Sequence, residues 1–225
     1  GALNTGRVGA GAVGASDSSA LVFGGTDGSG TAYTAAESYN GSAWTEVADT
    51  SDGHMYCFGL GTVTAGLAAG GYPGVSASEE WDGSSWTEVG DLNTGRNYGV
   101  LGGATQNTAI ITGKSPASAN TETFDGSSWT EVGDLNTGRG GMGRASDGSK
   151  TDFLVFGGTS NSAKTESFNG SSWSELNDLS TGSNETQGSG TTSSAIKAGG
   201  NTASAGRATT EEWSFAASVE TVAFD

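Results

Sequence analysis

The chain contains almost none of the residues that build disulfides and metal centres. Its 225 residues include one cysteine, Cys57, and one histidine, His54. An intrachain disulfide is therefore excluded, and the chain alone cannot assemble a zinc cluster. No run approaches the roughly 18 consecutive apolar residues of a membrane-spanning helix. We expect no metal, no cofactor and no membrane insertion.

Basic residues and proline are also scarce. Nine lysines and arginines face 25 aspartates and glutamates, which gives a formal net charge of −16, and two prolines accompany 40 glycines. Because so few cations cannot neutralise a phosphate backbone, nucleic acid is excluded as a partner. An acidic, glycine-rich composition is typical of disordered chains, unless a regular repeat lets the chain bury a shared core.

A repeat of this kind runs through the chain. Each copy has a glutamate, an aromatic residue two positions later and, in four copies, a tryptophan five positions further on. The aromatics recur every 42 to 45 residues, which is the period of propeller blades. In the fifth copy, residues 219–222 stand where the tryptophan segment would lie. The glutamates are Glu37, Glu79, Glu122, Glu166 and Glu211; the aromatics are Tyr39, Trp81, Phe124, Phe168 and Trp213; and the tryptophans are Trp44, Trp86, Trp129 and Trp173.

Each copy carries sequence signals for four strands. It opens with Leu-Asn-Thr-Gly-Arg or a variant, followed by a segment rich in Gly and Ala (8–15, 98–105 and 140–145) that suits a crowded innermost strand. An apolar run ending in small residues predicts the second strand. Asn-Gly or Asp-Gly then marks a hairpin between the third and fourth strands. We predict an all-β, five-bladed β-propeller with four antiparallel strands per blade, forming one domain over 1–225 with blades at about 1–48, 49–90, 91–133, 134–177 and 178–225.

The order of arginine, Gly-Gly, Glu-x-aromatic with Asn or Asp, and then tryptophan resembles the kelch repeat over nearly the whole chain. The motif Leu-Asn-Thr-Gly-Arg, together with Asn/Asp-Gly-Ser-Ser-Trp-Thr-Glu-Val, is similar to the repeats of kelch-type proteins of marine bacteriophage and environmental bacteria. This resemblance implies a location in a virion or on an extracellular surface. Blades two and five depart from it by lacking the arginine, and blade five also lacks the tryptophan.

The opening arginines Arg7, Arg96 and Arg139, with His54 in the same slot, admit two interpretations. As a ring at the channel mouth they would grip an anionic or sugar ligand. As structural residues, each would pair with a repeat glutamate, since a partly buried charge needs a partner. Recurrence once per copy favours the structural pairing. It likewise favours packing between blades for the repeat tryptophans.

The loops that follow the Gly-Gly landmark differ between copies, and variable loops on a rigid scaffold commonly carry binding sites. They contain Tyr72 and Lys114, which join Arg7, His54, Arg96 and Arg139 as candidate binding residues. We expect a non-enzymatic adhesion module of a phage virion or surface appendage that recognises a glycan or protein through one propeller face. The alternative is a structural or decoration subunit that docks to neighbouring chains, including other virion subunits.

A glycoside-active enzyme is the third and least favoured hypothesis. Two carboxylates must flank the bond that a glycosidase cleaves, and the predicted inner strands 8–15 and 98–105 contain none. The Asp-rich turns lack the alternating acidic spacing of a dedicated calcium loop. We therefore predict no catalytic residues.

Overall fold

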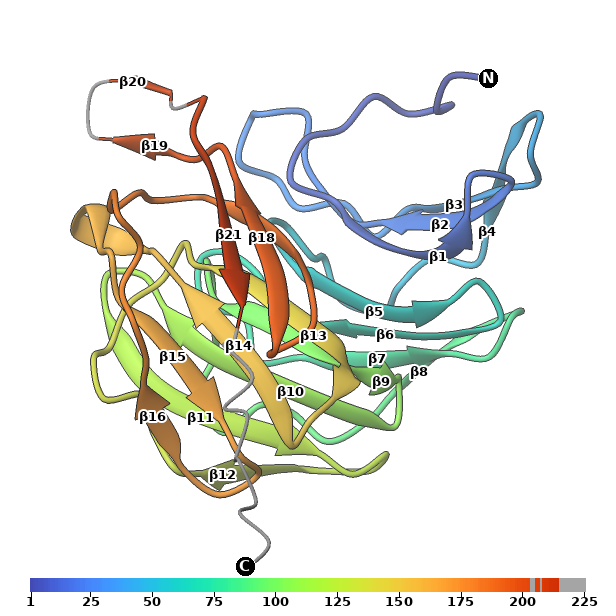
Figure 1. The fold of residues 1–225 in the computed structure, drawn as a ribbon. Coiled ribbons are helices and arrows are strands. Elements are labelled where there is room, and N and C mark those ends of the chain that lie inside the picture. The colour runs from blue at the N-terminus through green and yellow to red at the C-terminus, as the bar shows by residue number, and fades with distance from the viewer. Residues whose placement is uncertain (203–204, 207, 215–225) are drawn as a thin grey trace, which may run out of the picture.

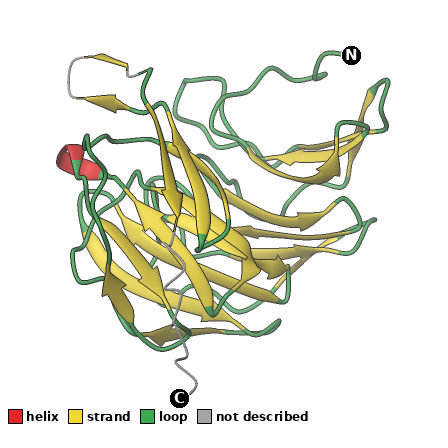
Figure 2. Cartoon of the chain, in the orientation of Figure 1, coloured by secondary structure: helices red, strands yellow, loops and turns green. Residues whose placement is uncertain are grey.

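The structure is a computed structural model that describes residues 1–202, 205–206 and 208–214. The protein is all-β: the helical structure among these residues is one 3-10 turn at Thr159–Asn161 (Figure 2). The strands form six antiparallel sheets, four of which have four strands. None of the described helical structure is long and apolar enough to cross a membrane.

Each four-stranded sheet is built from consecutive strands of the chain (Figure 1). The first holds β1 (Gly11–Ser16), β2 (Ser19–Phe23), β3 (Ala36–Tyr39) and β4 (Trp44–Val47). The second holds β5 (Phe58–Thr62), β6 (Ala65–Ala69), β7 (Ser78–Trp81) and β8 (Trp86–Glu88). The third holds β9 (Val100–Thr105), β10 (Thr108–Lys114), β11 (Ser118–Phe124) and β12 (Trp129–Val132). The fourth holds β13 (Gly143–Ser149), β14 (Asp152–Phe156), β15 (Thr165–Phe168) and β16 (Trp173–Glu175).

The last part of the chain departs from this plan. A three-stranded sheet joins β17 (Gln187–Gly190), β18 (Ser194–Ala198) and β21 (Thr210–Ser214), and a two-stranded ribbon joins β19 (Asn201–Thr202) and β20 (Ala205–Gly206). The segment 219–222, where the repeat predicts a fourth strand, lies outside the described residues.

The hairpins between third and fourth strands follow directly from the Asn/Asp-Gly-Ser sequence. In the first sheet, the Asn40 side-chain oxygen accepts hydrogen bonds from the backbone N–H groups of Ser42 and Ala43, each 3.0 Å long. Asp82, Asp125 and Asn169 hold the same turn in the next three sheets. These hydrogen bonds lower the pKa of Asp82 and of Asp125 to about 2. Glycine at a φ of 93° at position 41 supplies the left-handed residue that the turn needs.

The repeat aromatics fill the junctions between sheets. Trp129 donates its indole N–H to Ser78 of the preceding sheet at 3.0 Å, and Trp173 donates to Thr121 in the same manner at 3.0 Å. Trp86 packs edge-on against Phe23 of the preceding sheet, with ring centroids 4.9 Å apart. These three tryptophans are buried, whereas Trp44 is partly exposed and contacts Tyr39 of its own sheet. The aromatics therefore bind one sheet to the one before it.

The innermost strands β1, β5, β9, β13 and β17 lie beside one another in that order. This succession of antiparallel sheets is compatible with a β-propeller. The sequence placed the innermost strands too early, at 8–15, 98–105 and 140–145; the strands instead begin at Gly11, Val100 and Gly143. The residues in between include Gly9, Tyr98 and Gly141, whose positive φ an extended strand cannot contain.

Candidate functional site: a tyrosine cluster on left-handed turns

One backbone position recurs with a positive φ just before each innermost strand. It lies two residues after the arginine slot and is occupied by Gly9, Tyr56, Tyr98, Gly141 and Glu185, with φ of 64°, 53°, 54°, 63° and 50°. Glycine adopts this conformation freely, whereas a residue with a Cβ pays about 1–2 kcal/mol for it. Two copies use glycine here, and three place a large side chain on a strained backbone.

Hydrogen bonds between neighbouring turns hold this conformation. The Tyr56 N–H donates to the Gly9 carbonyl at 2.6 Å, the Gly141 N–H donates to the Tyr98 carbonyl at 2.6 Å, and the Glu185 N–H donates to the Gly141 carbonyl at 2.7 Å. These bonds join the Gly9 turn to the Tyr56 turn, and the Tyr98, Gly141 and Glu185 turns in succession, which gives the side chains at these positions fixed starting points.

Tyr56, Tyr72 and Tyr98 form an exposed aromatic cluster, which we call the tyrosine cluster. Tyr56 stacks on Tyr98 with centroids 6.0 Å apart and 20° between the rings, and meets Tyr72 edge-on at 6.4 Å. The three residues are 40%, 45% and 38% exposed. They border a hollow of about 300 Å³, whose other walls are Met55 and the loop at 26–30.

Glu185 lies beside the tyrosine cluster and borders the same hollow as Tyr56 and Tyr98. Burial raises the pKa of Tyr98, and the nearby charges of Tyr56, Glu185 and Tyr72 raise it further. Asn201 donates its side-chain amide to the Glu185 carboxylate at 2.6 Å, which orients it. The hollow that Tyr56, Tyr98 and Glu185 share is a second one, of about 280 Å³, to which the turns before all five innermost strands contribute. The cluster therefore stands at the mouth of a shared central space.

The structure pairs the arginine slots with the repeat glutamates. Arg7 contacts Glu37 at 2.7 Å and Arg96 contacts Glu122 at 2.5 Å, with all four side chains buried. Arg139 contacts Glu166 in the same way, and His54 contacts Glu79 at 3.2 Å. In the last sheet, where Ser183 replaces the arginine, Glu211 instead accepts a hydrogen bond from the Ser180 N–H at 2.6 Å.

These pairs also fasten the loop that opens each copy. Glu37 accepts hydrogen bonds from the backbone N–H groups of Asn4 and Thr5 at 2.7 and 3.1 Å. Burial raises the pKa of Glu37, but the hydrogen bonds from Asn4, Thr5 and Arg7 outweigh it, and the pKa is lowered. A ligand-binding role for Arg7, His54, Arg96 and Arg139 stays a prediction, and their side chains lie inside the protein in this structure.

The other two candidate residues lie on the loop face. Tyr72 is part of the tyrosine cluster, and its N–H donates to the Met55 carbonyl at 2.5 Å. Lys114 is partly exposed, and its Nζ lies close to Gly74. A Cβ built on that glycine would be 3.7 Å from the Nζ atom. Tyr56 and Tyr98 are not among the binding residues predicted from the sequence. The signal that could have identified them is a tyrosine at a position that other copies fill with glycine.

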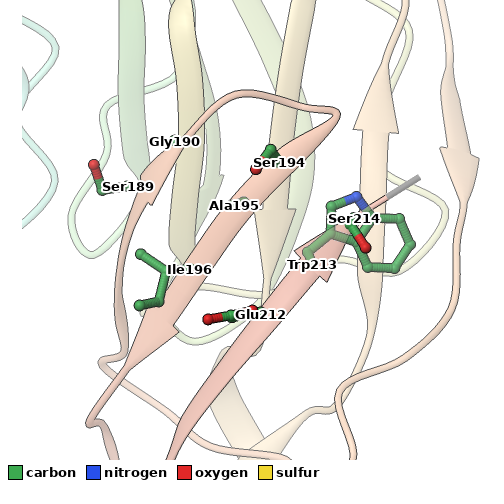
Figure 3. A pocket seen from close by; sticks show the side chains of 8 residues that line it. All are labelled: Ser189, Gly190, Ser194, Ala195, Ile196, Glu212, Trp213 and Ser214. Atoms are coloured by element: carbon green, nitrogen blue, oxygen red, sulfur yellow. The ribbon is translucent and has the colours of Figure 1, made fainter. Parts of the chain in front are cut away.

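A separate hollow of about 370 Å³ lies on the three-stranded sheet (Figure 3). Ile196, 41% exposed, and Glu212 stand on the same face of adjacent strands. The equivalent apolar side chains in the other sheets are buried: Leu21, Leu67, Ile110 and Leu154.

No family model matches the chain, and no curated protein matches it. Among the residues that the structure describes, no group of three or more His, Cys, Asp or Glu side chains is placed to hold a metal ion.

Proposed function

We propose that the chain is a five-bladed, kelch-type β-propeller. The contribution of the turns before five successive innermost strands to one hollow supports this arrangement. The buried Arg–Glu or His–Glu pair, which recurs in four successive sheets, supports the kelch assignment. The blade built around β17, β18 and β21 would then close the ring against the first sheet.

We further propose that this propeller is a non-enzymatic recognition module that binds a glycan through the tyrosine cluster. The observation that carries the proposal is the strained left-handed backbone under Tyr56 and Tyr98, where glycine serves in two other copies. Backbone strain of this kind persists at binding sites because the side chain it presents is needed there. A tyrosine presents a flat apolar ring and a hydroxyl at low entropic cost, which suits the apolar face and hydroxyls of a pyranose.

The proposal excludes catalysis at this mouth. A glycosidase needs two carboxylates on either side of the scissile bond. Glu185 is the one carboxylate among the described residues that line the two mouth hollows. Because the sequence resembles kelch proteins of phage and environmental bacteria, we propose that the chain acts in a virion or on an extracellular surface. The second class of partner that we propose is a protein.

The second candidate function is a decoration subunit that docks to neighbouring chains. The observation that favours it is the exposed Ile196 beside the hollow on the three-stranded sheet (Figure 3). A docking subunit would form a stable complex through this sheet and would bind no glycan. Substituting Ile196→Asp would abolish that complex.

A glycan array with the purified chain tests the first proposal. We expect saturable binding to a subset of glycans, lost in Tyr72→Ala and Tyr56→Gly and kept in Thr130→Ala, an exposed outer-strand control. Both site variants leave the buried ion pairs intact, so far-UV circular dichroism should match the native chain. Binding that survives both substitutions would refute the tyrosine cluster as the site, and the absence of binding to any glycan would favour the docking function.

A further inference from the structure

One arginine on an innermost strand has no role in the repeated ion pairs. Arg144 lies on β13, five residues after the arginine slot. The residues at the same place in the other copies are Ala12, Gly59, Leu101 and Gly188. The fold therefore accepts small or apolar side chains here, and a cation at this position has a cause other than the repeat architecture.

Among the described side chains, none supplies Arg144 with a compensating charge. Arg7, Arg96 and Arg139 each contact a glutamate, whereas no ion pair or side-chain hydrogen bond joins Arg144 to another described side chain. Arg144 is partly buried, and burial lowers its pKa. A guanidinium that has lost part of its hydration is stabilised by an anion that forms charge-assisted hydrogen bonds with it.

The space that Arg144 faces is shaped to admit such an anion. It is a hollow of about 450 Å³, whose other lining residues lie on β1, on β5 and at Ala20 of β2. Strands β1 and β5 are edge strands of their sheets, so some of their N–H groups point away from the sheet without a strand partner.

We propose that this hollow binds a small oxyanion, a carboxylate or phosphate group, with Arg144 as its cationic anchor. The planar guanidinium can donate two parallel hydrogen bonds to the two oxygens of such a group. The backbone N–H groups of β1 and β5 supply further donors. This site is separate from the tyrosine cluster and does not depend on glycan recognition.

Isothermal titration of the full chain with inorganic phosphate, at constant ionic strength, tests this site. We expect saturable binding that weakens on the order of tenfold or more in Arg144→Gln. Lys164→Gln, which removes an exposed cation that contacts Glu175, should bind phosphate as the native chain does. Phosphate also acts on many proteins non-specifically, by exclusion from their surface. The test is therefore whether saturable phosphate binding differs between the native chain and Arg144→Gln. Equal binding in both, or no saturable heat in the native chain, would overturn the proposal.

A second measurement uses the native chain and does not depend on the folding of a variant. Phenylglyoxal modifies accessible arginines, and mass spectrometry identifies the modified positions. Phosphate should protect Arg144 by several-fold, with acetate protecting it as well if a carboxylate also fits. Modification of Arg144 at an unchanged rate with phosphate present would contradict the site.

Discussion

Replacing Tyr98 by glycine and by alanine separates the strain of its backbone from the loss of its ring. The φ of Tyr98 is 54°, a region where a Cβ costs about 1–2 kcal/mol and glycine has no steric cost. Both substitutions remove the same contact with Tyr56, so this loss cancels in the comparison. Glycine loses about 0.5–1 kcal/mol more backbone entropy on folding than alanine. The difference favours Tyr98→Gly by about 0.5–1 kcal/mol.

Urea unfolding followed by tryptophan fluorescence measures this difference, and equal m values would show that both variants unfold the same structure. For a chain of this size, about 1 kcal/mol corresponds to a shift of roughly 2–4 °C in Tm. The matched control is Thr130, an exposed residue of β12 outside the positive-φ set. There the order should reverse, with alanine the more stable by about 0.5–1 kcal/mol.

The reasoning is refuted if Tyr98→Ala is at least as stable as Tyr98→Gly. In that event the left-handed turn stores no strain, and the observation that carries the proposed function is lost. If glycine is the more stable and both variants lose glycan binding, stability and recognition are opposed at this position. That opposition is expected of a residue kept for its ligand.

Three further substitutions test the surrounding structure. Arg96→Met leaves the Glu122 carboxylate buried without its cation and should lower the free energy of unfolding by about 3–5 kcal/mol in urea titrations; a loss below about 1 kcal/mol would show that the pair is solvated. His54→Arg should remove a pH dependence. Burial lowers the pKa of His54, but the hydrogen bonds that its ring donates to the Glu79 carboxylate and the Gly70 carbonyl outweigh this, so the folded pKa is raised. Native stability should therefore fall as pH rises above about 6.5, unlike that of the variant. Gly9→Ala places a Cβ 2.7 Å from the Tyr56 ring at a φ of 64° and should both lower stability by about 1–2 kcal/mol and weaken glycan binding; unchanged binding on the array would show that the ring position is not critical.

The sign of the His54 effect follows from the direction of the shift. A raised folded pKa gives stability that is fully present below the unfolded value and is lost as pH rises through the folded value. The pKa of Glu79 is lowered: burial raises it, but the hydrogen bonds from His54 and from the Ser51 and Asp52 N–H groups outweigh this. The Glu79 contribution is therefore lost only as pH falls below about 4.5.

Much of the fold could be predicted because the repeat encodes it locally. The Asn40-Gly41 turn depends on neighbouring residues alone, and the pairing of Arg7 with Glu37 follows from the recurrence of both residues in most copies. Their regular spacing fixed the order of the sheets. The starts of the innermost strands were placed too early because the left-handed turn at Gly9 and its equivalents has no fixed residue type.

The candidate site could be predicted only in part. Tyr72 was named because it stands in a variable loop. Tyr56 and Tyr98 lie 42 residues apart, and only the packing of neighbouring sheets brings their rings to 6.0 Å. The two tyrosines occupy equivalent positions of neighbouring copies, where two other copies have glycine, so the sequence could single out the position but not the contact. Arg144 leaves no recurring signal, since its position is small or apolar in the other copies.

A crystal structure of the full chain with the strongest glycan from the array would locate the ligand relative to the tyrosine cluster. We expect a pyranose stacked on Tyr98 or Tyr56, with a hydroxyl within hydrogen-bond reach of Glu185. A glycan bound elsewhere, with the three tyrosines free, would contradict recognition through the tyrosine cluster.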